Sequence, residues 1–254
     1  MPPTETFPHA TSTALSTVES HQTPQDLIFY AGWWCPFAHR SWIALEEKGI
    51  PYQYKEVNPF KKEKHFLDIN PRGLVPAIEY QGKALFESLV LCEFLEDAYP
   101  NHKPSILPGD AYTKAHARIW TDFAGKTLAP GFMRLLMAQG QEKQDVARTE
   151  LYDAIRKFSA QIKGPYFLGE EFSLVDIAIA PWVVRDFIAA EHRGYSRSDV
   201  GTEWKQYAEH VEQRGSVLRT KSDLDKYAEN WVPYLKDEAQ SQFAIALRAG
   251  RAIP

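Results

Sequence analysis

The sequence predicts an α/β domain followed by an all-helical domain. Short runs of strand-forming residues alternate with helical segments over residues 26–99. Residues 100–110 are rich in Pro and Gly, a composition typical of a linker. Beyond the linker, apolar residues recur at helical spacing and no pair of strands is predicted. We therefore expect a leader over 1–24, an α/β domain over 25–99, the linker, and a helical domain over 111–254.

The leader has a composition of its own. Residues 1–24 contain nine Ser and Thr and four Pro, and they lack Lys and Arg. A secretory signal begins with basic residues and a transit peptide is rich in arginine, so neither is predicted. The polar composition instead favours a flexible segment.

The α/β domain begins with strand, turn and helix. The apolar run Leu27–Ala31 predicts a strand, and the stretch Pro36–Lys48 predicts a helix that Gly49 ends. A second strand is expected over Tyr52–Val57 and a short charged helix over Lys61–Asp68.

The domain ends with a hairpin and a helix. Val75–Tyr80 and Ala84–Phe86 fit two strands joined by a turn at Gln81 and Gly82. The residues Glu87–Tyr99 predict a helix, because four apolar residues share one face: Leu91, Phe94, Leu95 and Ala98. The predicted order over 26–99 is therefore βαβαββα.

The second half predicts helices throughout. One helix start has two physical causes: Ser173 and Asp176 form the pattern of a capping box, and Phe172 and Ile177 flank it at the positions of a hydrophobic staple. The helices are expected over 111–139, 145–162, 173–190 and 204–214.

Charge and composition exclude several classes of function. The 29 Lys and Arg against 33 Asp and Glu leave a net charge of −4, so no broad basic surface for nucleic acid is expected. The apolar stretch Ile177–Val184 is far shorter than the roughly 20 residues that span a bilayer, so a soluble protein without a membrane partner is expected. The eight histidines are scattered and show no ligand spacing, which gives no support for a metal site.

The two cysteines predict thiol chemistry rather than a disulfide framework. Such a low cysteine content suggests a reducing compartment, the cytoplasm. Cys35 stands between a predicted strand and helix, with Pro36 at the first helical position. Backbone N–H groups and the helix dipole at that position stabilise a thiolate. Ala38 stands where a dithiol oxidoreductase has its second cysteine, so a mixed disulfide on Cys35 must be resolved by a thiol from solution. Cys92 lies on the helix predicted over Glu87–Tyr99, and its side chain is expected to pack against neighbouring residues.

Three motifs together resemble the omega class of glutathione transferases, the cysteine type, in a fungal-like form. They are Cys35-Pro-Phe-Ala-His-Arg40, Asn70-Pro-Arg-Gly-Leu-Val-Pro76 and Phe86-Glu-Ser88. The resemblance covers about residues 26–240, the capping box included. It implies a thioredoxin-like first domain, a helical second domain, a homodimer, bound glutathione as co-substrate, and a cis bond before Pro76.

The resemblance also implies a glutathione site. Glu87 would take the amine, and Ser88, expected as the N-cap of the next helix, would bind the γ-glutamyl carboxylate. The Val75 backbone before Pro76 would pair with the cysteinyl backbone of glutathione, and Lys62 would hold the glycine carboxylate. Phe37 belongs to the same expected set. Without the resemblance, Glu87 and Ser88 could be ordinary helix-capping residues, and Lys62 could belong to a solvated charged face.

An acceptor pocket is expected for a small apolar or aromatic substrate. Trp33 and Trp34 precede Cys35 and either line that pocket or pack in the core. The resemblance adds four candidates: Met133 on the helix predicted over 111–139, and Tyr227, Trp231 and Tyr234 near the C-terminus. His39 is treated as structural.

The function predicted from these residues is glutathione-dependent thiol transfer. Cys35 would form a mixed disulfide with glutathione, in deglutathionylation or in the reduction of dehydroascorbate. Two alternatives remain: a glutathionyl-hydroquinone reductase, and a non-catalytic carrier of aromatic ligands.

Overall fold

A computed structural model describes residues 8–59 and 61–251. The described chain forms two compact units. The first, here called the thioredoxin-like unit, contains residues 8–110 together with 213–223. The second, the helical unit, contains 111–212 and 224–251.

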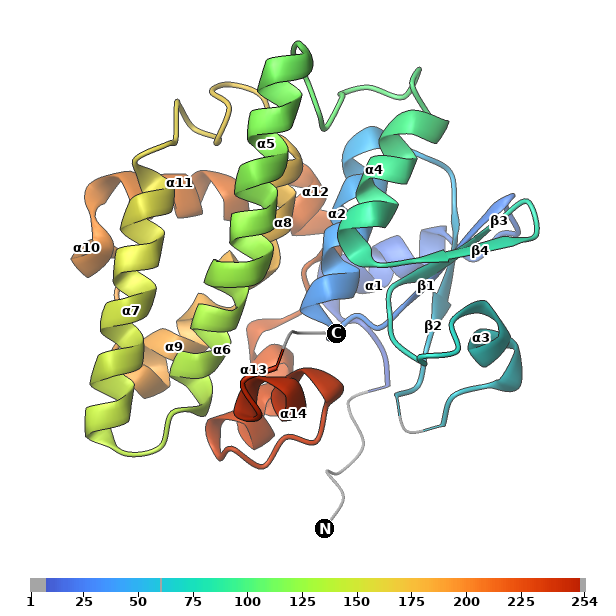
Figure 1. Ribbon diagram of the computed structural model, residues 1–254. Coiled ribbons are helices and arrows are strands. Elements are labelled where there is room, and N and C mark those ends of the chain that lie inside the picture. The colour runs from blue at the N-terminus through green and yellow to red at the C-terminus, as the bar shows by residue number, and fades with distance from the viewer. Residues whose placement is uncertain (1–7, 60, 252–254) are drawn as a thin grey trace. The chain divides into compact units, whose positions relative to one another are not determined.

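A four-stranded sheet is the centre of the thioredoxin-like unit (Figure 1). Its strands are β1 (Leu27–Ala31), β2 (Gln53–Glu56), β3 (Ala77–Tyr80) and β4 (Lys83–Phe86), in the order β2-β1-β3-β4. Strand β2 is parallel to β1, whereas β3 is antiparallel to both β1 and β4. The hairpin turns at residues 81 and 82, which both have positive φ, as a tight two-residue turn requires.

Helices cover both faces of this sheet. Helix α2 (Pro36–Lys48) packs against α4 (Ser88–Ala98), and α4 also contacts β3 and β4. The short helix α3 (Lys64–Ile69) packs Phe66 and Ile69 against Tyr30 on the opposite face, since Phe29 and Tyr30 alternate along β1. The βαβαββα order and the thioredoxin-like fold predicted from the sequence are confirmed. Helix α2 has the predicted bounds and ends at Gly49 with φ of 58°, whereas α3 starts three residues later than predicted.

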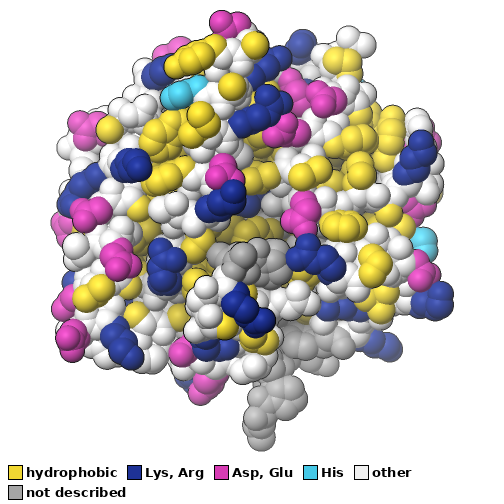
Figure 2. Space-filling model, viewed as in Figure 1, with side chains coloured by type: hydrophobic (Ala, Val, Ile, Leu, Met, Phe, Trp, Pro, Cys, Tyr) yellow, Lys and Arg dark blue, Asp and Glu magenta, His cyan; other side chains and the backbone are white. Residues whose placement is uncertain are grey.

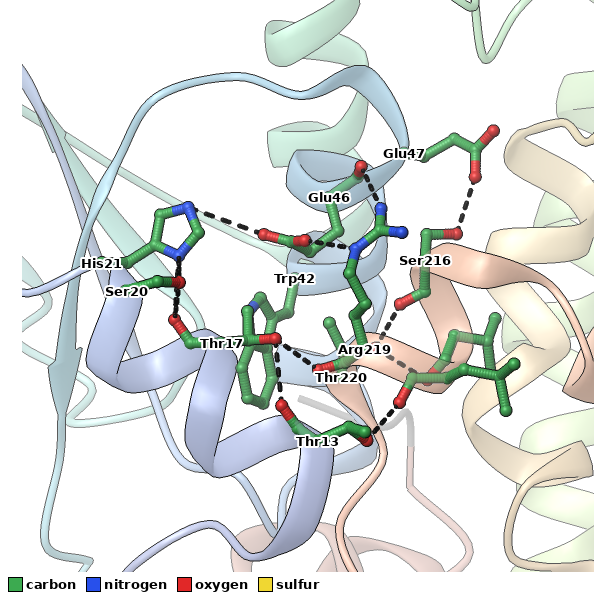
Figure 3. A network of polar contacts seen from close by, with 12 residues as sticks. Thr13, Thr17, Ser20, His21, Trp42, Glu46, Glu47, Ser216, Arg219 and Thr220 are labelled. Carbon is green, nitrogen blue, oxygen red and sulfur yellow. Dashed lines mark hydrogen bonds and ion pairs between the residues drawn. The ribbon is translucent and has the colours of Figure 1, made fainter.

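The expectation of a flexible leader was wrong for residues 12–20, and residues 1–7 lie outside the described part. Residues Ser12–Ser20 form helix α1, which packs on α12 (Gly215–Thr220), and α12 packs on α2. Figure 3 shows the reason: the Thr13 and Thr17 hydroxyls donate hydrogen bonds of 2.7 Å to the Leu218 and Arg219 carbonyl oxygens of α12. Ser and Thr side chains that suggest a loop thus bond to a distant helix.

The helical unit contains no strand of the sheet, and all its named elements are helical. A π-helical turn at Ala124–Leu128 joins α5 (Ala111–Phe123) to α6 (Ala129–Met137), so the long helix predicted there is nearly continuous. The helix predicted over 173–190 is two helices, because the backbone leaves helical geometry at Arg185, which has a φ of −109° and a ψ of 1°. The remaining helices are α7 (Gln141–Ser159), α8 (Leu174–Val183), α9 (Asp186–Arg193), α10 (Arg197–Val200), α11 (Thr202–Glu212), α13 (Leu224–Leu235) and α14 (Gln242–Arg248).

The predicted capping box at the start of α8 is present. The Asp176 carboxylate accepts hydrogen bonds from the Ser173 backbone N–H and hydroxyl, from the Phe167 N–H and from the Tyr207 hydroxyl. These donors compensate the burial of a carboxyl group that is fully shielded from solvent.

Charged side chains of both signs lie at the surface (Figure 2). On the face shown in Figure 2, basic and acidic side chains are interspersed rather than gathered by sign. In the described part of the chain, no helix has both the length and the apolar character needed to cross a membrane.

Candidate active site

Cys35 is the N-cap of α2, at the position that the sequence predicted. Its backbone N–H donates to the Gly32 carbonyl oxygen at 2.9 Å, and its carbonyl oxygen accepts from the His39 N–H at 3.0 Å. Pro36 lacks an N–H, so the N–H groups of Phe37 and Ala38 are the first at this helix terminus. The residue is 7% exposed. The residue is therefore buried, and its thiol lies in the field of the helix N-terminus.

The Val75 carbonyl faces this thiol. The Cys35 Sγ lies 3.8 Å from the Val75 oxygen, within the range of an S–H···O bond. The bond from Val75 to Pro76 is cis, as the resemblance implied. No hydrogen bond engages the Val75 backbone N–H among residues 8–59 and 61–251. This segment therefore offers both a donor and an acceptor of the main chain beside the sulfur.

Arg40 places a buried positive charge near both cysteines. It is 3% exposed, its guanidinium lies 5.3 Å from the centroid of the Phe37 ring, and its Nη1 donates to the Ser88 Oγ at 3.5 Å. Burial lowers the pKa of Arg40 to about 10, although the nearby Cys92 and Cys35 thiols act to raise it. The guanidinium thus remains charged at neutral pH and favours a thiolate nearby.

Cys92 differs from Cys35 in its surroundings. It lies within α4 and is fully buried, as predicted. Burial raises the pKa of its thiol to about 12, although Arg40 acts in the opposite direction. Cys92 is therefore protonated at neutral pH and unreactive.

Glu87 and Ser88 lie at the start of α4, but their roles in the helix differ from the prediction. Glu87 is the N-cap, with a φ of 78°, and Ser88 is the first helical residue. The Glu87 Oε1 forms an ion pair of 2.5 Å with Arg72, and its Oε2 has no partner among the described residues. A non-glycine residue at positive φ is strained, and such strain is often retained where it aims a functional group.

Lys62 lies close to the segment that ends in Pro76. Its exposed side chain folds over Gly73, where an added Cβ would be 3.0 Å from the Nζ. Gly73 has a φ of 64°, a conformation that favours glycine, whereas the flexible end of the Lys62 side chain could move away from an added Cβ. Lys62 itself precedes α3 rather than lying within the predicted helix.

The two tryptophans before Cys35 have different surroundings. Trp33 is 1% exposed, so its ring has no face open to an acceptor from solution. Trp34 is half-buried, and its indole lies over Gly32, where an added Cβ would come within 2.8 Å. Of the two tryptophans, Trp34 remains a candidate residue of the acceptor pocket.

The other acceptor candidates lie in the helical unit. Met133 is on α6 and is buried. On α13, Tyr227 is buried, and the Arg185 guanidinium lies 3.9 Å from its ring centroid. The Trp231 and Tyr234 rings lie 5.6 Å apart, measured between centroids, at a tilt of 38°. Tyr234 is half-buried and donates a hydrogen bond to Ser241.

Three charged residues around the site were missed as functional candidates. Arg40 lies in the motif that begins with Cys35, and Arg72 lies in the motif that ends with Pro76. A basic residue in the same motif as a candidate cysteine, or one that could pair with the acidic Glu87, is a sequence signal that could have identified them. Glu56 has no sequence signal. Its relation to the Cys35 turn depends on the register of β2 beside β1, which pairs Glu56 with Ala31.

Family models match both units. The model described as Glutathione S-transferase, N-terminal domain, matches residues 34–98, and the model for the C-terminal domain of the same family matches residues 107–210. The predicted two-domain fold class is thereby confirmed.

Known proteins agree with this assignment. Glutathione transferase Omega 3C from Trametes versicolor has 59% sequence identity and a TM-score of 0.88, covering 92% of this chain and 100% of that one. Rice GST1, solved in complex with glutathione, has 28% identity and a TM-score of 0.77, covering 84% and 99%. Glutathione S-transferase omega-1 of Sus scrofa is 34% identical over 167 residues, 64% of this chain and 68% of that protein. The predicted resemblance to the omega class is confirmed, and the chain belongs to the glutathione S-transferase family.

Proposed function

We propose that this chain is a glutathione-dependent thiol transferase whose nucleophile is Cys35. The observation that carries the proposal is the position of Cys35: a thiol at the N-terminus of α2, facing the main chain of Val75. The family uses glutathione as its substrate, and reduced glutathione is abundant in the cytoplasm, where a protein with free thiols fits.

Two sources of positive potential support a Cys35 thiolate. The first is the N-terminus of α2, where the positive end of the helix dipole favours an anion. The second is the buried guanidinium of Arg40, whose own pKa responds to the Cys35 thiol. Cys92 shares the second source but not the first, and it is fully buried within a helix. Of the two cysteines, Cys35 alone has both the helix terminus and the Arg40 guanidinium to favour a thiolate.

The residues around the sulfur fit the functional groups of glutathione. The Val75 N–H and C=O would pair with its cysteinyl backbone as an added strand. The Ser88 hydroxyl, together with the N–H groups at the start of α4, would bind the γ-glutamyl carboxylate, and Glu87 Oε2 would bind the amine. Lys62 would reach the glycine carboxylate, and Phe37 and Pro76 would border the tripeptide.

The reaction proceeds through two exchanges at sulfur. The Cys35 thiolate attacks the glutathionyl sulfur of a mixed disulfide; the Cys35–glutathione bond forms, and the other thiol leaves and takes a proton. The thiolate of a second glutathione then attacks the glutathionyl sulfur bound to Cys35, which releases oxidised glutathione and restores the Cys35 thiolate. With dehydroascorbate, two glutathiones are oxidised and the acceptor gains two electrons and two protons. Ala38 at the place of a second cysteine accounts for the need of a second glutathione.

The acceptor is proposed to be small and apolar or aromatic. Trp34 is half-buried next to Cys35 in the chain and would offer one ring face to it. Met133, Tyr227, Trp231 and Tyr234 are kept as further candidates in the helical unit. A homodimer is part of the same proposal.

The deciding variant is Cys35→Ser. A serine hydroxyl keeps the size and the hydrogen bonding, but it forms neither an appreciable anion nor a disulfide. Disulfide reduction by glutathione should fall to the background rate, while glutathione affinity, measured by calorimetry, should stay near the parental value.

Cys92→Ser is the matched control, and it should retain the parental rate of transfer. Parental activity in Cys35→Ser would refute the nucleophile assignment. Absence of transfer in the parental protein, with tight binding of aromatic ligands, would instead support the carrier alternative.

A further inference from the structure

The turn that carries Cys35 is built from four residues, Gly32 to Cys35. The Gly32 carbonyl and the Cys35 N–H close the turn at 2.9 Å, and the Trp34 indole lies against the Gly32 backbone. Before the turn, the Ala31 carbonyl accepts from the Val57 N–H at 2.7 Å, which joins the end of β1 to the end of β2. The position of the thiol thus depends on how this turn is attached to β2.

Glu56, the last residue of β2, makes that attachment through its side chain. Its Oε1 accepts a hydrogen bond of 3.2 Å from the Trp33 backbone N–H, inside the turn. Its Oε2 accepts a hydrogen bond of 2.8 Å from the Tyr54 hydroxyl. One carboxylate therefore bridges the turn and the strand.

The Tyr54 end of this bridge is fixed. Tyr54 is 1% exposed, and its ring packs 5.0 Å from Trp42 and 5.9 Å from Phe29, measured between centroids. Because the ring cannot shift without disturbing the core, its hydroxyl holds the Glu56 carboxylate in one place. The carboxylate in turn fixes the Trp33 N–H, two residues before the nucleophile.

We propose that Glu56 is a positioning residue for Cys35, acting through the Trp33 backbone N–H rather than on substrate. This inference rests on the proposed role of Cys35 as the nucleophile. The bridge restrains the turn so that the Sγ stays beside the Val75 main chain. Loss of the acceptor would free the turn and lower the fraction of molecules with the thiol in its reactive place.

The experiment compares Glu56→Ala, Glu56→Gln and Lys55→Ala. The Gln side chain keeps an oxygen for the Trp33 N–H and offers its amide N–H to the Tyr54 hydroxyl, so it preserves the bridge without the charge. Lys55→Ala is the matched control, an exposed neighbour on the same strand. The first measurement is the rate of Cys35 alkylation by iodoacetamide, followed by mass spectrometry of the Cys35 peptide; the second is kcat and KM for disulfide reduction.

We expect Glu56→Ala to slow alkylation about tenfold, and Glu56→Gln and Lys55→Ala to stay within about twofold of the parent. In Glu56→Ala, kcat should fall with the alkylation rate while KM for glutathione is unchanged, because Glu87, Ser88 and Lys62 are elsewhere. Melting temperatures verify that all variants are folded.

Two results would overturn the proposal: a parental alkylation rate in Glu56→Ala, or equal slowing in the Ala and Gln variants. Either result leaves the nucleophile assignment intact, since alkylation reports thiol reactivity whatever the natural acceptor is. Conversely, if Cys35→Ser retained full activity, the proposed function would fail while the alkylation rates still measured the effect of Glu56 on the thiol.

Discussion

The two thiols of this chain differ in their surroundings. Cys35 and Cys92 are both close enough to Arg40 to influence its pKa. Only Cys35 lies at a helix N-terminus, whereas Cys92 is inside α4 without exposure, with its pKa raised to about 12. Because both thiols share this cation, the proposal that Cys35 is the nucleophile rests on its place at the helix terminus.

Incubation with oxidised glutathione should consequently add one glutathione per chain, at Cys35. Cys92 should stay unmodified, because a protonated and buried thiol does not attack a disulfide. Intact-mass analysis gives the number of adducts and peptide mapping gives their position. Modification mainly at Cys92 would contradict the assignment of the site.

A second prediction at this scale concerns pH and Glu56. Loss of hydration raises the pKa of its carboxyl from 4.5 to about 7, despite the hydrogen bonds from Tyr54 and Trp33, although the residue as a whole is exposed. Between pH 4.5 and 7 the folded chain keeps this proton while the unfolded chain releases it, so the contribution to stability present below pH 4.5 is lost as pH rises to 7. Glu56→Gln lacks this loss. Its melting temperature relative to the parent should be higher at pH 8 than at pH 5; an equal difference at both values would disprove the effect.

Among the helices, α12 has a role that its short length does not suggest. It connects α1 to α2, the helix that carries Cys35 (Figure 3). Glu47 of α2 accepts hydrogen bonds from Arg214 and from the Ser216 hydroxyl, and Glu46 accepts one from Arg219. The Thr220 hydroxyl lies 2.9 Å from the His39 Nε2, one helical turn beyond Cys35. His39 is thus part of this helix contact, in agreement with a structural role.

Glu47→Ala should destabilise the fold by about 2–3 kcal/mol, because the side chain is 5% exposed and its loss removes the acceptor of two donors on or next to α12. This corresponds to a melting temperature lower by about 5–10 °C. Lys64→Ala is the control: its ion pair with Asp68 is 89% and 61% exposed and should contribute less than about 0.5 kcal/mol. Equal, small shifts in both variants would argue against a stabilising contact at Glu47.

Local signals in the sequence predicted the elements that depend on neighbouring residues. Pro36 and Gly49 gave both ends of α2, and Ser173 with Asp176 gave the start of α8. Helices α1 and α12 were not predicted, because their stability comes from residues about 200 positions away, such as the pair Thr17 and Arg219. The same holds for the site: Cys35 has a local signal, whereas the contact of Glu56 with Trp33 depends on strand register.

At the scale of the whole molecule, the thioredoxin-like unit is discontinuous in sequence. Residues 213–223 belong to it, although the sequence placed them in the helical domain. The chain therefore leaves this unit after residue 110, returns for α12 and leaves again at 224. Within the segment, Val217 and Ser216 are buried to 0% and 1% exposure, so it contributes core residues.

This arrangement predicts that a fragment ending at residue 110 is incomplete. Without α12, the faces of α1 and α2 that pack on it lose their cover, and burial of Val217 alone is worth about 1.5–3 kcal/mol. A fragment of residues 1–110 should unfold at a lower urea concentration than the same fragment joined by a Gly/Ser linker to residues 213–223. The difference should be about 2–4 kcal/mol by far-ultraviolet circular dichroism and tryptophan fluorescence. A linker with the 213–223 sequence scrambled should give no gain, and identical midpoints for the native and scrambled fusions would show that α12 is dispensable to this unit.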